Sequence, residues 1–321
     1  MNPFLWFFGG LVVATTTLWV SLAVHYHFRR PWMRFIASLI PWIIVGIAYF
    51  ALPWFPWGLV VWAGLILAAS LWFFALRPRV DLDWEVGMEI LPQAEIQGDN
   101  LHVRNLRNSR YSETGSPTAR YEERVYDLSK LNSIDYFLSH WSGPFMAHTM
   151  VSFGFSDGQY LCVSIEARRQ KWQSYSPLWG LFRAYELMFI FGDERDLIWV
   201  RTNIRRENIY MYRLQLTPQH LNRLLLDYVH RLRSLRDKPK WYNSIYSNCT
   251  TNLFYEGNAK VPWSLKPMIF LNGLSAYALY QLGYIDGRLT FPELRSRSAI
   301  RERALAAGDI ANISQTIRER T

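Results

Sequence analysis

The stretch AHTMVSFGFSDGQYLCVSIEARR, Ala147 to Arg169, carries the clearest structural signal in the sequence. Apolar residues alternate with polar or small ones on both sides of Ser156-Asp157-Gly158. These apolar residues are all odd-numbered: Val151, Phe153, Phe155, Leu161, Val163 and Ile165. Alternation with a period of two predicts half-buried strands, and the turn residues between them predict a β-hairpin.

The register of this hairpin follows from its odd-numbered pattern. If the apolar residues share one buried face, opposed residues must both be odd or both be even. A two-residue Asp-Gly loop breaks this rule, whereas a three-residue loop, 156–158, keeps it and puts Gly158 where a positive φ is needed. That register places His148 opposite Glu166 on the second, more polar face. A loop shifted by one residue would instead pair His148 with Arg168.

A second stretch supplies a nucleophile. In YNSIYSNCTTNLFYEG, Tyr242 to Gly257, a helix is expected to begin near Cys249 and to run to about Tyr255. Unpaired N–H groups and the helix dipole stabilise a thiolate at such a position, and an adjacent imidazolium adds to this. Cys249 as nucleophile, His148 as base and Glu166 as the orienting carboxylate would form a triad. The Cys249 N–H is also suited to an oxyanion hole.

Each of these residues also has an ordinary structural explanation. His148 alone is more often a structural histidine, Glu166 a solvated strand carboxylate and Cys249 a small buried residue, while Asn248 is a natural helix cap. Only the joint pattern favours a site. The other cysteine, Cys162, has no predicted role, and two cysteines make no disulfide framework, so two free thiols are expected. The histidine spacing predicts no metal site, and no phosphate loop or other cofactor motif is present.

The remaining soluble sequence mixes strand and helix patterns. Helices are expected over 218–236 and 269–282, where apolar residues have helical spacing. Further strands are expected over 100–103, 120–128, 133–137, 197–202 and 209–216. Because strands and helices do not alternate as βαβ units, the fold class is predicted to be α+β.

The N-terminal part of the chain differs from the rest because long apolar runs dominate it. Three apolar runs, 4–24, 35–52 and 59–76, each have about the length needed to cross a hydrocarbon core of ~30 Å. The chain therefore divides into a membrane anchor of two to three transmembrane helices (1–76), a linker (77–100), a catalytic domain (101–290) and a basic tail (291–321). Arg29, Arg30 and Arg34 lie between the first two runs, which predicts a cytoplasmic loop and, with three spans, a cytoplasmic domain. A re-entrant pair of runs would reverse this.

The formal net charge is +9, with basic clusters at 231–240 and 295–303. Beside a membrane anchor, such clusters favour anionic lipid head groups. Nucleic acid is not expected as a partner, because no binding motif accompanies the charge. Solvated helix faces are the alternative explanation.

Several short motifs occur in the same order as in one known family. They are His148-Thr149, Ser152–Phe155, Ser164–Arg169, Tyr185–Leu187, Asp193–Asp196, Tyr242-Asn243 and Asn248–Thr251. Over about residues 85–260 the chain resembles the Lnb-type lipoprotein N-acyltransferase domain family. The histidine-before-cysteine order is also similar to permuted papain/NlpC-like enzymes, which implies a central antiparallel sheet.

The resemblance implies a membrane-anchored thiol acyltransferase that moves an acyl chain from a phospholipid or lipoprotein ester to an amine. In the type activity of the family, the acceptor is the lipoprotein's own N-terminal amine. It implies Cys249 as nucleophile and His148 as base, with Arg168, Tyr185, Asn248 and Tyr242 as candidate substrate-binding residues and no cofactor. It also implies a multi-pass protein of the inner (cytoplasmic) membrane with a periplasmic soluble domain. This location is opposite to the cytoplasmic one that the arginines between the first two apolar runs predict.

Two other functions remain open from the sequence. A cysteine peptidase or amidase acting on envelope peptides would use the same catalytic residues, but in an open polar cleft rather than beside an apolar acyl groove. A non-catalytic envelope protein that binds lipid or a partner would place Cys249 away from His148.

Overall fold

The computed structural model describes residues 3–51, 55–112, 114–256, 260–310 and 312–319. The chain forms two compact units. A helical unit comprises Met1–Arg79 and Ser174–Tyr185, and a sheet unit comprises Val80–Gln173 and Glu186–Thr321.

The helical unit contains three helices that are long and apolar enough to cross a membrane, as the sequence predicts. They are α1 (Pro3–His25), α2 (Pro31–Ala51) and α3 (Phe55–Ala75). Trp62 of α3 donates a hydrogen bond to Thr16 of α1, 3.1 Å away. Many of their large apolar side chains are exposed, which suits helices surrounded by lipid. The short helix α4 (Pro177–Leu181) belongs to the same unit.

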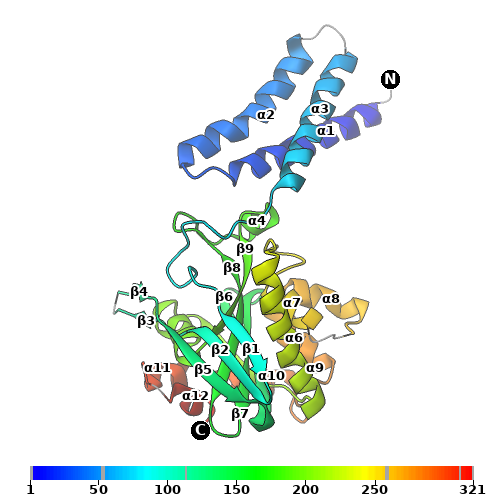
Figure 1. The fold of residues 1–321 in the computed structure, drawn as a ribbon. Helices are drawn as coiled ribbons and strands as arrows, with labels where there is room; N and C mark the ends of the chain where they lie inside the picture. The colour runs from blue at the N-terminus through cyan, green and yellow to red at the C-terminus, as the bar shows by residue number, and fades with distance from the viewer. Residues whose placement is uncertain (1–2, 52–54, 113, 257–259, 311, 320–321) are drawn as a thin grey trace. The chain divides into compact units, whose positions relative to one another are not determined.

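The sheet unit is built on eight strands (Figure 1). Their order is β1-β2-β9-β8-β7-β6-β10, and β5 also pairs with β2. The strands are β1 (Gln93–Gln97), β2 (Asn100–Arg107), β5 (Tyr121–Asp127), β6 (Leu131–Ser142), β7 (Met146–Phe155), β8 (Tyr160–Arg168), β9 (Glu186–Gly192) and β10 (Asn208–Arg213). The pairs are antiparallel except β2–β9, which is parallel. The α+β class is confirmed, but the sheet is mixed, because β9 re-enters beside β2 after the chain has left for the helical unit.

The β7–β8 hairpin has the predicted register. Val151 lies opposite Val163 and Met150 opposite Ser164, which is the pairing of a three-residue loop. Gly158 has a φ of +84°, the left-handed conformation that this loop requires.

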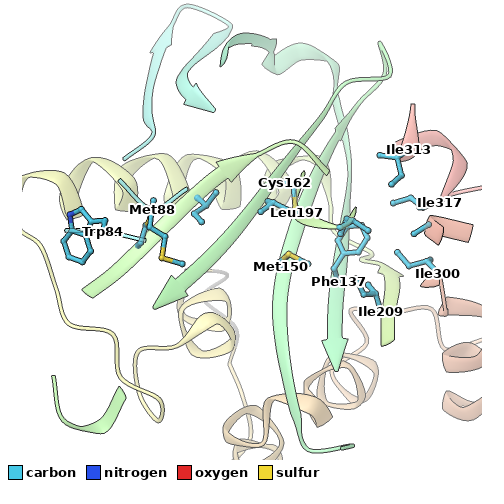
Figure 2. Close-up of a cluster of buried hydrophobic side chains, with 14 residues drawn as sticks. Trp84, Met88, Phe137, Met150, Cys162, Leu197, Ile209, Ile300, Ile313 and Ile317 are labelled. Carbon is cyan, nitrogen blue, oxygen red and sulfur yellow. The ribbon is translucent and has the colours of Figure 1, made fainter. Parts of the chain in front are cut away.

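Helices cover both faces of the sheet (Figure 1). On one face, α6 (Pro218–Asp237) packs Tyr228 against Phe153 and Phe189. The second face was expected to be more polar, and that expectation is wrong for its centre, where Cys162 is fully buried with Met150 and Phe137. Isoleucines of the C-terminal segment cover it (Figure 2): Ile300, Ile313 and Ile317.

Most of the two segments expected to be peripheral belongs to the sheet unit. Of residues 77–100, expected to be a linker, the part from Val80 onward belongs to this unit and contributes β1 and the buried side chains Trp84 and Met88. Residues 291–321, expected to be a basic tail, form α10 (Phe291–Ser298), α11 (Arg301–Ala307) and α12 (Ile313–Thr316). Isolated apolar residues among the arginines are enough to dock these short helices.

Two secondary-structure predictions are corrected. The strand expected over 197–202 is instead α5 (Glu194–Leu197) followed by a π-helical turn, η2 (Val200–Ile204), because Asp193 caps a helix start. The helix expected over 269–282 is divided into α8 (Lys266–Phe270), η4 (Asn272–Leu274) and α9 (Ser275–Gln281). The α-helix ends before Leu271, whose ψ of 74° is not helical. Gly273 follows in η4, where a Cβ atom would lie 2.3 Å from the Pro144 carbonyl oxygen.

Candidate active site

Cys249, His148 and Glu166 meet at the start of α7 (Cys249–Glu256). The His148 Nε2 atom lies 3.2 Å from Glu166 Oε1. Ser164 connects the two, with its hydroxyl 2.7 Å from His148 Nε2 and donating to Glu166 Oε1 over 2.7 Å. The His148 ring and the Cys249 thiol lie close enough for each to shift the pKa of the other. Because Nε2 faces the carboxylate, Nδ1 is the nitrogen left for the sulfur.

The helix start that carries Cys249 is fixed by its cap. Asn248 Oδ1 accepts hydrogen bonds from the N–H groups of Thr250 and Thr251, both at 2.9 Å. Its Nδ2 donates to the Ser244 carbonyl at 2.8 Å. Asn248, a candidate substrate-binding residue, therefore serves as the N-cap. Cys249 is the first residue of the helix, where N–H groups have no intrahelical acceptor.

The charges around the site favour an ion pair. Burial by itself raises the pKa of the Cys249 thiol, but His148 and the N–H and hydroxyl of Thr149 outweigh it and lower the pKa to about 7. Burial lowers the pKa of His148, whereas the Glu166 carboxylate and Cys249 raise it to about 9. At a pH between these values, the stable form is a thiolate beside an imidazolium.

Arg201 is a member of this cluster that sequence reasoning missed. Its side chain is buried, and its Nη2 donates to Glu166 Oε1 at 2.9 Å. Burial opposes the ionisation of Glu166, but the His148 and Arg201 charges hold the pKa of this carboxyl well below its usual range. Arg201 lies in the π-helical turn η2, where the sequence predicted a strand, so its direction could not be inferred.

Replacing Arg201 with glutamine should change the pH dependence of the site as well as its rate. Burial and the Arg201 charge lower the pKa of His148, so removing the charge should raise that pKa and move the alkaline limb of the rate profile upward. Glu166 also loses one of its anchors, and we expect kcat/KM to fall roughly 10-fold, less than the ~10²-fold or greater loss of a general base. The measurement is kcat/KM for acyl transfer as a function of pH, in the wild type and in Arg201→Gln.

Arg201→Lys is the matched variant, because it keeps the charge and should keep the alkaline limb near its original pH. Circular dichroism checks that both variants fold. An Arg201→Gln profile with lower activity and an unmoved alkaline limb would contradict a positioning role.

Tyr136 on β6 also lies next to the thiol. It is fully buried, its hydroxyl is 2.5 Å from Ser275 Oγ, and Thr149 hydrogen-bonds to it. Burial raises the pKa of this phenol, and the charge of Cys249 adds to the rise, so the hydroxyl stays protonated. Because Ser275 Oγ donates its proton to the Asn272 carbonyl, the Tyr136 hydroxyl is the donor to Ser275 Oγ. Tyr136 sits within a predicted strand, and nothing in its sequence context distinguished it.

The other predicted residues have different surroundings. Arg168 donates to the Met88 and Glu89 carbonyls, both at 2.9 Å, and stacks on Trp84, which ties the segment before β1 to the sheet. Tyr185 belongs to the helical unit, where its hydroxyl donates to the Ser174 carbonyl at 2.5 Å. Tyr242 is buried in the segment that leads to Cys249. Their substrate-binding roles stay predictions.

Within the described ranges, which omit 1–2, 52–54, 113, 257–259, 311 and 320–321, no group of three or more His, Cys, Asp or Glu side chains is arranged to hold a metal ion.

Comparison with known proteins supports the resemblance seen in the motifs. Residues 118–273 match the model of a family described as the Lnb N-terminal periplasmic domain, and this segment contains His148, Glu166 and Cys249. No curated protein and no solved structure matches the chain, so the permuted papain/NlpC-like topology stays a prediction. The family match and the three apolar helices fit a membrane-anchored envelope protein.

Proposed function

We propose that this protein is a membrane-anchored thiol acyltransferase, which moves an acyl chain from a lipid or lipoprotein ester to an amine through a thioester on Cys249. The observation that carries the proposal is the Cys249–His148–Glu166 cluster at the start of α7. A nucleophile, a base and an orienting carboxylate within hydrogen-bond reach are what acyl transfer needs.

In the first half of the reaction, the Cys249 thiolate attacks the ester carbonyl carbon and forms a C–S bond. The carbonyl electron pair moves to oxygen, where the Cys249 N–H at the helix start is suited to stabilise it. When the intermediate collapses, the C–O bond breaks and the leaving alkoxide takes the proton of the His148 imidazolium. The chain is then held as a thioester.

In the second half, the acceptor amine attacks the thioester carbonyl, and neutral His148 takes its proton. The C–S bond breaks, and the thiolate–imidazolium pair is restored. Glu166 and Arg201 keep the imidazole in one orientation through both halves, because Glu166 accepts from His148 by way of Ser164.

Exposed apolar side chains near the catalytic residues favour a lipid substrate over a peptide. Ile245 and Tyr246, 52% and 62% exposed, lie in the tight turn just before Cys249. Phe145 precedes His148, and its carbonyl accepts from the Gly273 N–H at 3.0 Å, which brings the exposed Leu271 segment close. Apolar side chains gathered at a site and left in water commonly mark a ligand or membrane contact.

Replacing Ile245 and Tyr246 together with serine should therefore raise KM for a long-chain acyl ester. Full burial of such a side chain contributes about 1.5–3 kcal/mol, so partial contact by two of them predicts roughly a 10-fold rise. The same variant should leave a two-carbon acyl ester unaffected, because that chain does not reach the turn. Steady-state kinetics with a series of chain lengths measures both.

Val125→Ser, an exposed apolar position on β5, is the control and should change neither KM. A peptidase or amidase would show no chain-length dependence and would cleave envelope peptides instead, which contradicts acyl transfer. A non-catalytic protein would separate Cys249 from His148, whereas here the His148 charge lowers the pKa of the Cys249 thiol.

We also propose that the protein lies in the inner (cytoplasmic) membrane with its sheet unit in the periplasm, as the description of the matching family suggests. Basic residues of the helical unit make contacts within the protein, which weakens their use as evidence for a cytoplasmic sheet unit. Arg34 stacks on Trp179, 4.6 Å from the ring centroid, and Arg183 donates to the Phe73 and Phe74 carbonyls at the end of α3. An alkaline phosphatase fusion near residue 90 should be active, and an inactive one would place the sheet unit in the cytoplasm.

A further inference from the structure

A cavity of about 1260 Å³ lies along β10 and contains none of the residues of the candidate active site. Its walls come from β10, the 285–289 segment, α10, α11 and Arg318 near the C-terminus. Six arginines line it against three carboxylates. The arginines are Arg213, Arg288, Arg297, Arg301, Arg303 and Arg318, and the acids are Asp135, Asp286 and Glu302.

Part of this charge is balanced within the protein. Asp135 is buried and accepts from both Arg213 Nε, at 2.6 Å, and Arg318 Nε, at 2.8 Å. Arg318 also pairs with Glu194, and Arg288 pairs with Asp286 at 2.5 Å. These ion pairs balance the charges of Arg213, Arg288 and Arg318 within the protein.

Three arginines remain without a carboxylate partner among the described residues. The donors of Arg303 go to the carbonyls of Glu319 and Ala299. The Arg301 Nε atom is buried and has no hydrogen-bond partner in the described part of the chain. Arg297 is exposed at the end of α10, and its charge acts on Glu293 one turn earlier without a close ion pair between them. Buried polar groups are almost always hydrogen-bonded, and a ligand oxygen is one acceptor that would satisfy Arg301 Nε.

We propose that this cavity binds the phosphate group of an organic phosphate ester. Guanidinium groups bind phosphate oxygens through paired, charge-assisted hydrogen bonds, which makes an arginine group the natural partner of a phosphate. The volume is far larger than a free phosphate ion needs. The same walls contain Ile285, Leu289 and Leu294, which suit the organic part of such a ligand. A phospholipid head group and a soluble phosphorylated compound share this chemistry.

The test uses the full chain purified in a non-ionic detergent, with binding measured by isothermal titration calorimetry. The probes are glycerol 3-phosphate, and dihexanoyl phosphatidylglycerol below its micelle concentration. Both should bind saturably if the phosphate is what is recognised, and binding should weaken with added salt. Tighter binding of the lipid would identify a phospholipid source, and equal binding would identify a soluble one.

Replacing Arg297 and Arg301 together with glutamine should weaken binding at least ~10-fold, because two charge-assisted hydrogen bonds are lost. Arg297→Gln alone, on an exposed side chain, should weaken it less and guards against misfolding of the pair. Arg223→Gln, an exposed arginine on α6, is the matched control and should bind like the wild type. No saturable binding of either probe, or unchanged binding in the double variant, would overturn the proposal.

Discussion

Replacing Cys249 with alanine is expected to reduce acyl transfer by ~10³-fold or more, to the level of the uncatalysed background. Removing the nucleophile of a covalent mechanism leaves no atom on which the intermediate can form, and losses of this size are typical of such changes. Cys249 is nearly fully buried at the helix start, and its surroundings are held by the Asn248 cap, so the site should keep its shape. The measurement is transfer from a diacylglyceryl lipopeptide to its own N-terminal amine.

Cys162 supplies the matched control. It is also fully buried, but in the apolar cluster on the second face of the sheet, where burial raises the pKa of its thiol well above the usual value. Cys162→Ala should therefore keep most of the activity and lose at most a little stability. If Cys249→Ala kept its acyl transfer activity, or if only Cys162→Ala lost it, Cys249 would not be the nucleophile.

Replacing His148 with glutamine is expected to have the second largest effect, a loss of roughly 10²- to 10⁴-fold in rate. Burial raises the pKa of the Cys249 thiol, and His148 is the main group that lowers it to about 7. Without His148, burial prevails and the thiol should become protonated at neutral pH. The rate of alkylation by iodoacetamide, measured against pH, reports the thiolate directly.

The wild-type alkylation rate should rise with a midpoint near pH 7, and the midpoint of His148→Gln should lie at higher pH. The reaction itself needs both the thiolate and the imidazolium, so its rate should be greatest between about pH 7 and about pH 9. His230→Gln, an exposed histidine on α6, should behave like the wild type. An unchanged alkylation midpoint in His148→Gln would mean that the two side chains do not form an ion pair.

The core of the candidate site could be predicted because it depends on local rules. The strict alternation around 156–158 and the need for a left-handed Gly158 left one favoured register, and that register placed His148 opposite Glu166. The position of Cys249 followed from a short helix after a capping asparagine. His148 and Cys249 are about 100 residues apart in the chain. Their pairing was predicted because a nucleophile needs a base, and because the family resemblance implies both residues.

The parts that were missed depend on contacts distant in sequence. β9 is buried on both faces, so ELMFIFG shows no alternation and gives no strand signal by that rule. Arg201 is directed at Glu166 only because Asp193 starts a helix and the chain then forms a π-helical turn. The 269–282 helix is divided at Leu271, whose ψ is not helical, and Gly273 then lies close to the Pro144 carbonyl, which no local pattern reveals.

The measurement that tests the central claim most directly is intact mass spectrometry of the detergent-solubilised protein after incubation with a diacylated lipopeptide. The account predicts an added mass of one acyl group on the wild type, removed by hydroxylamine as a thioester should be. It predicts no such adduct on Cys249→Ala and a much slower one on His148→Ala. An adduct that persists in Cys249→Ala, or no adduct on the wild type with any diacyl lipid, would contradict a thioester mechanism at this site.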